Sequence, residues 1–96
     1  MLFRSMDLGI VMAIISSYRD IALPEKTIVF GEIGLTGEVR GIGKAKQRIA
    51  EAERLGYKLC IVPRVNVPEA SGASEIKVIG VANVKEAVEI LIKRNQ

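Results

Sequence analysis

The sequence is most distinctive at Gly31-Glu-Ile-Gly-Leu-Thr-Gly-Glu-Val-Arg-Gly-Ile-Gly43. Its five glycines predict tight turns on both sides of a short strand at Leu35–Arg40. A glycine-rich turn that leads into a lysine-bearing helix can hold phosphate on its backbone N–H groups. However, the pattern is neither a P-loop nor a complete dinucleotide fingerprint. On spacing alone, tight turns between a strand and a helix are therefore the simpler interpretation.

The elements on both sides of this stretch alternate between helix and strand. After it, Ala45, Ile49, Ala52 and Leu55 recur at helical spacing, and Gly56 is a natural left-handed helix stop. The order α-β-β-α-β-β-α predicts an α/β domain. The other predicted elements are a helix at Met6–Arg19, strands at Thr27–Phe30, Leu59–Val62 and Ile76–Ile79, a loop at Val65–Ser74, and a helix from Asn83 to Lys93.

Local signals fix several details of these elements. Asp7 is expected in the first turn of the first helix, whose apolar residues run nearly all the way round and predict cover on most sides. The continuous apolar strand Leu59–Val62 predicts a sheet covered on both faces. Gly80 is expected to end the strand before it, and Asn83 with Glu86 resembles a capping box.

Composition excludes several kinds of site. The 96 residues contain no His and one Cys, so a Ser-His-Asp triad, a Cys-His pair, a zinc site and an internal disulfide are ruled out. Cys60 is expected to be a small core residue. We expect no metal and no cofactor. The apolar run Leu8–Ile15 lacks a cleavage site and is too short to span a bilayer, so we expect a cytoplasmic protein with no membrane contact.

The net charge of +3 is carried by one segment. Residues 40–54 contain five basic and two acidic residues, and the rest of the chain is balanced. A short basic segment can touch DNA phosphates with weak, salt-sensitive affinity, although a solvated surface is the more common explanation. No aromatic residue lies within this segment, so base stacking is not expected. The candidate phosphate contacts are Arg40, Lys44, Lys46 and Arg48.

The Gly31–Gly43 segment resembles the strand–turn–strand of Lon-type protease domains. The resemblance covers about residues 6–92, and its form is similar to the RadA (Sms) family of bacterial DNA-repair proteins, whose C-terminal domain is Lon-like. The blocks that carry it are Asp7-Leu8, Phe30–Arg40, Gln47-Arg48, Arg54–Lys58, Ile61–Asn66 and Ile79–Val81.

The resemblance places two residues at the positions of the Lon Ser–Lys dyad. Asp7 stands where the nucleophilic serine would be, and Lys46 where the general base would be. A carboxylate lacks the hydroxyl that forms an acyl-enzyme, so these residues are expected to be non-catalytic. Lys46 is interpreted as a solvated or phosphate-facing lysine, with an ion pair to Asp7 as an alternative. Ser5 lies two residues upstream, about 200° around a helix, and does not fit the nucleophile position.

The resemblance implies a Lon protease-like (ribosomal protein S5 domain 2-like) fold that lacks its first strands. Residues 1–5 are then a remnant or an added start, and residues 6–96 a partial Lon-like domain. A sheet without its first strands has an open edge, which favours homo-oligomers. The implied function is an oligomerisation scaffold and auxiliary DNA contact in a DNA-dependent repair ATPase. The alternatives are a fragment of a Lon-type Ser–Lys ATP-dependent peptidase and a purely structural fragment.

Overall fold

The computed structural model describes residues 6–24, 26–70 and 75–93, and it confirms the α/β class. Residues 1–5, which we predicted to be a remnant or an added start, lie outside the described residues. The helices are α1 (Leu8–Arg19), α2 (Ala45–Arg54), the 3-10 turn η1 (Arg64–Asn66), α3 (Val67–Ala70) and α4 (Val84–Lys93). The strands are β1 (Met6–Asp7), β2 (Thr27–Val29), β3 (Glu32–Ile33), β4 (Val39–Arg40), β5 (Leu59–Pro63) and β6 (Lys77–Val81).

The strands form two small sheets. One is parallel, in the order β2-β5-β6, with Ile28 beside Cys60 and Cys60 beside Val78. The other is antiparallel, in the order β1-β3-β4, with Asp7 beside Glu32 and Glu32 beside Arg40. All five residues of β5 are buried, which confirms the prediction of a strand covered on both faces.

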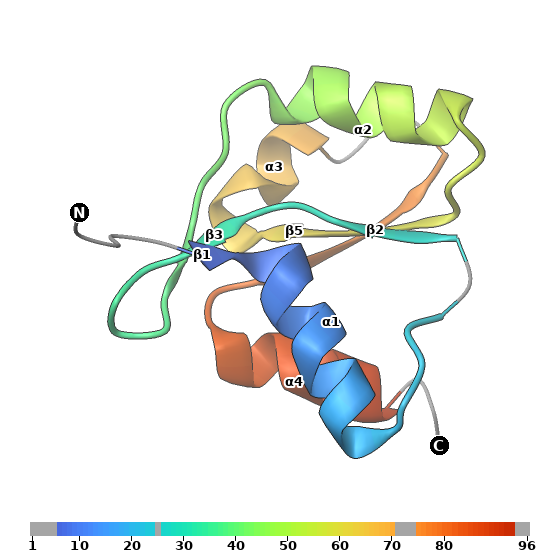
Figure 1. The fold of residues 1–96 in the computed structure, drawn as a ribbon. Coiled ribbons are helices and arrows are strands. Elements are labelled where there is room, and N and C mark those ends of the chain that lie inside the picture. Colours follow the sequence, from blue (N-terminus) through green and yellow to red (C-terminus); the bar gives the residue numbers. More distant parts are fainter. Residues whose placement is uncertain (1–5, 25, 71–74, 94–96) are drawn as a thin grey trace.

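Helices cover both faces of the parallel sheet. Figure 1 shows α2 and α3 on one face and α1 and α4 on the other. Each face has its own apolar cluster. Leu8, Met12, Ile61 and Leu91 belong to the cluster beneath α1 and α4, and Ile49, Ala52, Cys60 and Val62 to the cluster beneath α2. In the described part of the chain, no helix is long and apolar enough to cross a membrane.

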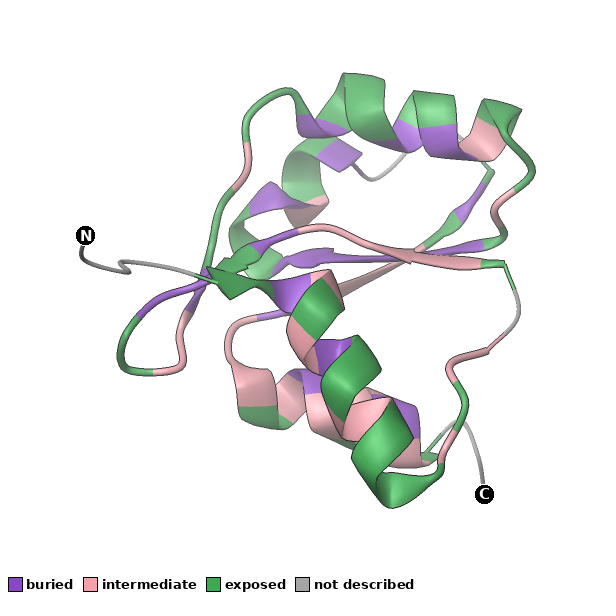
Figure 2. Cartoon of the chain, in the orientation of Figure 1, coloured by how far each residue is buried: buried purple, intermediate pink, exposed green. Residues whose placement is uncertain are grey.

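The first helix begins later than predicted. It starts at Leu8, and Asp7 is its N-cap, with a side chain that accepts a hydrogen bond from the Ile10 N–H at 3.0 Å. The expectation of cover on most sides was wrong, because Ile10 and Ile14 are each 58% exposed. Figure 2 shows that much of α1 is coloured as exposed, in green.

Three other expectations needed correction. The predicted strand at Leu35–Arg40 is a turn followed by the two residues of β4, and Gly37 has a φ of 86° in that turn. The predicted loop at Val65–Ser74 contains η1 and α3, and its last four residues lie outside the described residues. Strand β6 continues through Gly80 to Val81, because a glycine there lets the strand approach η1: a Cβ would lie 3.1 Å from the Arg64 Cα. The observed order therefore contains short elements that the predicted order α-β-β-α-β-β-α lacks, namely β1, an additional strand between β2 and α2, η1 and α3.

The predicted helix signals near the C-terminus of α2 and the start of α4 are confirmed. Gly56 adopts a φ of 97°, and its N–H donates to the Glu53 C=O while the Tyr57 N–H donates to the Ala52 C=O. These two bonds make a Schellman motif. At α4, Asn83 accepts from the Glu86 N–H at 2.9 Å, and the Glu86 carboxylate accepts from the Ala82 N–H at 2.6 Å.

The glycine-rich loop is held by a buried side chain. The Asn66 Oδ1 accepts from the Ile42 N–H at 2.9 Å, and its Nδ2 donates to the Ile42 C=O at 3.0 Å. Asn66 is only 7% exposed, and both bonds reach across 24 positions of sequence. The loop that leads into α2 is thereby tied to the end of β5.

We expect Asn66→Ala to destabilise the chain by about 2 kcal/mol, because it leaves the N–H and C=O of Ile42 without their partner. Urea unfolding followed by circular dichroism measures the change. Asn66→Asp is the matched control: it keeps the acceptor and removes the donor, so it should lie between the wild type and Asn66→Ala. Equal midpoints for all three proteins would contradict a structural role for Asn66.

Candidate functional site

Asp7 lies at the junction of β1 and α1, where its carboxylate is engaged by the helix. It accepts from the N–H of Ile10, the third residue of α1, and Gly9 leaves room for it: a Cβ at Gly9 would lie 3.0 Å from Oδ1. A carboxylate at a helix N-terminus satisfies a free N–H and interacts favourably with the helix dipole. The structural task of Asp7 is therefore to cap α1.

A polar hollow of about 270 Å³ opens beside Asp7. Glu32, the ladder partner of Asp7, lines it together with the backbone of the glycine-rich loop. The basic side chain at this hollow is Arg48, whose guanidinium lies 5.9 Å from the centre of the Phe30 ring. Two carboxylates and one guanidinium make the hollow unsuited to binding an anion.

Lys46 lies on another flank of α2. Successive residues of a helix turn by roughly 100°, so Lys46 and Arg48 point about 200° apart. The backbone N–H of Lys46 donates to the Glu69 carboxylate of α3 at 3.4 Å, and its side chain is exposed. The Arg48 side chain lies over Phe30, next to β2. Asp7 and Lys46 form no ion pair in the described residues, so the alternative of a pair between them is wrong.

The four candidate phosphate contacts are spread over two elements. Arg40, on β4, pairs with Glu38 at 3.4 Å. Lys44 precedes α2 with a left-handed φ of 56°, a conformation that costs a non-glycine residue about 1 kcal/mol. Lys44 and Arg48 line one groove, and Lys46 is exposed and does not line it. The structure therefore groups Lys44 with Arg48, and it places Arg40 and Lys46 apart from them.

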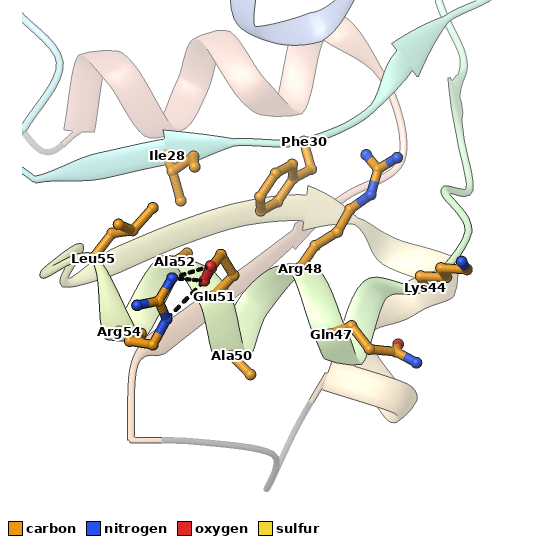
Figure 3. Close-up of a pocket in the computed structure, with 10 residues that line it drawn as sticks. All are labelled: Ile28, Phe30, Lys44, Gln47, Arg48, Ala50, Glu51, Ala52, Arg54 and Leu55. Carbon is orange, nitrogen blue, oxygen red and sulfur yellow. Dashed lines mark hydrogen bonds and ion pairs between the residues drawn. The ribbon is translucent and has the colours of Figure 1, made fainter.

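The groove lies between β2 and α2 and has a volume of about 750 Å³ (Figure 3). Its apolar residues are Ile28, Phe30, Ala50, Ala52 and Leu55, of which Leu55 is 63% exposed. Arg54 and Glu51 form an ion pair on its rim. In Figure 3 the Arg48 side chain rises from α2 next to the Phe30 ring.

Sequence reasoning missed Phe30 as a partner of the basic segment. No aromatic residue lies within residues 40–54, but the chain just after β2 brings Phe30 beside α2 from outside that segment. The alternation of Ile28 and Phe30 on one side of a predicted strand was the available signal, because both side chains must face the helix that covers it.

Cys60 is a core residue, as predicted. It is fully buried in the cluster beneath α2, and burial raises the pKa of its thiol to about 11. A thiol with this pKa stays protonated at neutral pH and is a poor nucleophile or metal ligand.

Glu38 closes the turn between β3 and β4. Its carboxylate accepts from the Thr36 hydroxyl at 2.5 Å and from the Thr36 N–H at 3.1 Å. The hydroxyl contact is the largest cause that lowers the pKa of Glu38 from 4.5 to about 2, and the Arg40 charge adds to it. Glu38 is thus ionised beside Arg40 at neutral pH.

Comparison with known proteins now gives the family. A family model described as subunit ChlI of Mg-chelatase matches residues 4–66. The chain belongs to this ChlI family. Its hollow, its groove and the glycine-rich loop all include residues within the matched range.

The chain is also similar to proteins named DNA repair protein RadA, which confirms the resemblance drawn from the sequence blocks. It is 43% identical over 90 residues to RadA of Halalkalibacterium halodurans, a match that covers 94% of this chain and 20% of the relative. It is 45% identical over 84 residues to RadA of Bacillus subtilis and 38% identical over 86 residues to RadA of Escherichia coli. These two matches cover 88% and 90% of this chain, and 18% of each relative. The chain thus spans about a fifth of the length of the curated relatives it matches.

We expect Asp7→Ser to fold with nearly unchanged stability and to remain unreactive toward a serine-directed acylating probe. Serine is a good N-cap, so the capping hydrogen bond survives, but Lys46 is not among the residues that line the hollow beside position 7 and is not placed to activate the new hydroxyl. Asp7→Ala, the matched control, should lower the stability by about 1 kcal/mol. Mass spectrometry of the probe-treated proteins measures acylation. A label at position 7 of Asp7→Ser that disappears when Lys46→Ala is added would contradict this assignment.

Glu38 should give a pH-dependent contribution to stability. Its pKa is lower in the folded chain than in the unfolded chain, so its contribution is complete above about pH 4.5 and is lost as the pH falls toward about 2. The difference in urea midpoint between the wild type and Glu38→Gln should therefore be constant from about pH 7 to 5 and shrink below that. A difference that does not change with pH would contradict the hydrogen bonds of Glu38 with Thr36.

Proposed function

We propose that this chain is a non-catalytic Lon-like domain of a RadA-type DNA-repair ATPase in the cytoplasm. Its work is to act as an oligomerisation scaffold and to add contacts to DNA phosphates. The observation that carries the non-catalytic part is the capping role of Asp7, which leaves no hydroxyl at the dyad position and, among the described residues, no lysine in the polar hollow beside it. Similarity to proteins named DNA repair protein RadA supports the repair context.

The peptidase alternative has less support. It needs a serine near Lys46, and Lys46 does not line the polar hollow beside Asp7. Ser5, the serine closest to Asp7 in sequence, lies outside the described residues. The ATPase chemistry of the whole protein is likewise proposed for residues beyond this domain, since the chain spans about a fifth of its relatives.

The DNA contact is proposed for Arg40, Lys44, Lys46 and Arg48. Lys44 and Arg48 share one groove rim, so a single phosphate backbone can reach both side chains. Arg40 is partly neutralised by its pair with Glu38, and Lys46 lies across α2. We therefore expect Lys44 and Arg48 to contribute more than the other two residues.

Binding of duplex and forked DNA as a function of salt tests this proposal. Replacing all four residues by alanine should abolish most binding at low salt. The slope of log K against log salt should fall by about 0.9 for each DNA phosphate that the protein no longer neutralises. The double variant Lys44→Ala with Arg48→Ala should bind DNA more weakly than Arg40→Ala with Lys46→Ala.

A matched control removes the same charge elsewhere. Lys58, Lys77, Lys85 and Lys93 are exposed and lie outside the basic segment, so their replacement by alanine changes the net charge equally. This control should keep most of the binding. An equal fall in affinity for both quadruple variants, or no binding by the wild type at low salt, would overturn the DNA contact.

A further inference from the structure

The groove between β2 and α2 changes in character along its length. In Figure 3 it runs from Leu55 and Ile28 at one end, past the Phe30 ring, to Arg48 and Lys44 at the other. The first end is apolar, and the second carries two cations. The volume of about 750 Å³ is in the range of sites that hold small organic groups, roughly 300–1,000 Å³. The groove therefore fits an occupant that has an apolar part and an anionic part.

The Phe30 ring is held in place and is partly open to this groove. It packs against the cluster beneath α2, yet it is only partly buried. Its backbone N–H donates to the Ile61 C=O at 2.8 Å, which fixes Phe30 beside the buried strand β5. The Arg48 guanidinium, 5.9 Å from the ring centre, lies at the outer limit of a cation–π contact, about 6 Å. A flat aromatic group that stacks on the ring therefore competes only with a weak contact.

The charges at the other end of the groove select an anion. The groove is lined by three basic residues and one acidic residue, and the acidic one, Glu51, is paired with Arg54. Lys44 and Arg48 form no ion pair in the described residues, and the Arg48 N–H donates to the Lys44 C=O at 3.0 Å, so the two lie on one side of the helix. Arg48 also lines the polar hollow, where two carboxylates offset part of its charge, so Lys44 carries the larger share of the attraction. Cations beside an aromatic ring suit a nucleotide, whose phosphate contacts the cations and whose base stacks on the ring.

We propose that this groove binds an unpaired nucleotide of single-stranded DNA, with the base stacked against Phe30 and the adjoining phosphates in contact with Lys44 and Arg48. A base inside a duplex is stacked on both faces, so it reaches the ring only if it leaves the helix. An unpaired base is free to stack, and stacking on an aromatic side chain beside a basic surface is a common mode of single-strand recognition. Phe30 supplies the aromatic ring that residues 40–54 lack. The inference rests on the proposed contact with DNA phosphates and identifies the form of DNA that this contact favours.

Comparison of a polythymidine strand with an abasic strand of the same length tests the base site. Both strands carry the same number of phosphates, so a difference in their dissociation constants isolates the bases. In fluorescence anisotropy at low salt, the wild type should bind the polythymidine strand about tenfold more tightly than the abasic strand. Equal dissociation constants would overturn the base site and leave the phosphate contact intact, whereas no binding of any DNA would overturn both. A dimer that Leu55→Asp disperses and that single-stranded DNA does not would place a second copy in the groove and would also overturn the base site.

Replacement of the ring tests the position of the base. Phe30→Leu keeps an apolar side chain, and it should lower the affinity for the polythymidine strand about tenfold, to that for the abasic strand. Phe30→Tyr keeps a ring and should retain the preference. Tyr57→Leu is the matched control and should bind like the wild type, because Tyr57 packs against the same cluster but is not among the residues that line the groove. Lys44→Ala should weaken the binding of both strands equally, since it removes a phosphate contact. A Phe30→Leu protein that retains the preference for bases would overturn the proposal.

Ultraviolet cross-linking locates the base without any substitution in the protein. A single strand that contains iodouracil should become attached to the wild type within the groove, with Phe30 as the expected site. Mass spectrometry of the digested complex identifies the attached residue. Attachment only to residues outside the groove would overturn the proposal.

Discussion

The two hydrogen bonds between the Asn66 amide and the Ile42 peptide determine where the candidate site lies. They tie the glycine-rich loop to the end of β5, the fully buried strand at the centre of the parallel sheet. Gly41 permits this approach, because a Cβ there would lie 2.8 Å from the Val65 side chain. Since the loop leads directly into α2, these two hydrogen bonds also set the position of α2 over β2. Lys44 and Arg48 reach the groove, and Arg48 reaches Phe30, as a consequence.

Asp7 is the N-cap of α1, at the position where the Lon resemblance would place a serine. Its carboxylate caps α1, and α1 contributes Leu8 and Met12, both almost fully buried, to the core beneath the sheet. A serine could cap the helix as well, so the cap alone does not demand a carboxylate. The carboxylate adds a favourable interaction with the helix dipole, which favours aspartate over serine where no acyl-enzyme has to form.

Local patterns in the sequence predicted some parts of this fold and not others. Helices α2 and α4 and strand β5 were predictable, because spacing, capping residues and apolar runs specify them within a few neighbouring positions. Strands β1, β3 and β4 have two residues each, and only pairing with other strands defines them. No run of β-forming residues in the sequence therefore predicts them. Turn η1 and helix α3 were missed because Pro68 and small residues look like a loop, although Pro68 lies in the first turn of α3, where proline is tolerated.

The candidate site illustrates the same distinction. The basic segment was visible in the sequence, but its division between two flanks of α2 depends on which residues the helix buries. Ala45, Ile49 and Ala52 fix the buried face, and from it the helical repeat places Arg48 toward β2 and Lys46 toward α3. The pairing of Arg48 with Phe30 depends instead on the parallel sheet, which no local pattern encodes. The basic residues of the site were therefore predictable from local sequence, whereas their partner Phe30 was missed because its position depends on long-range contacts.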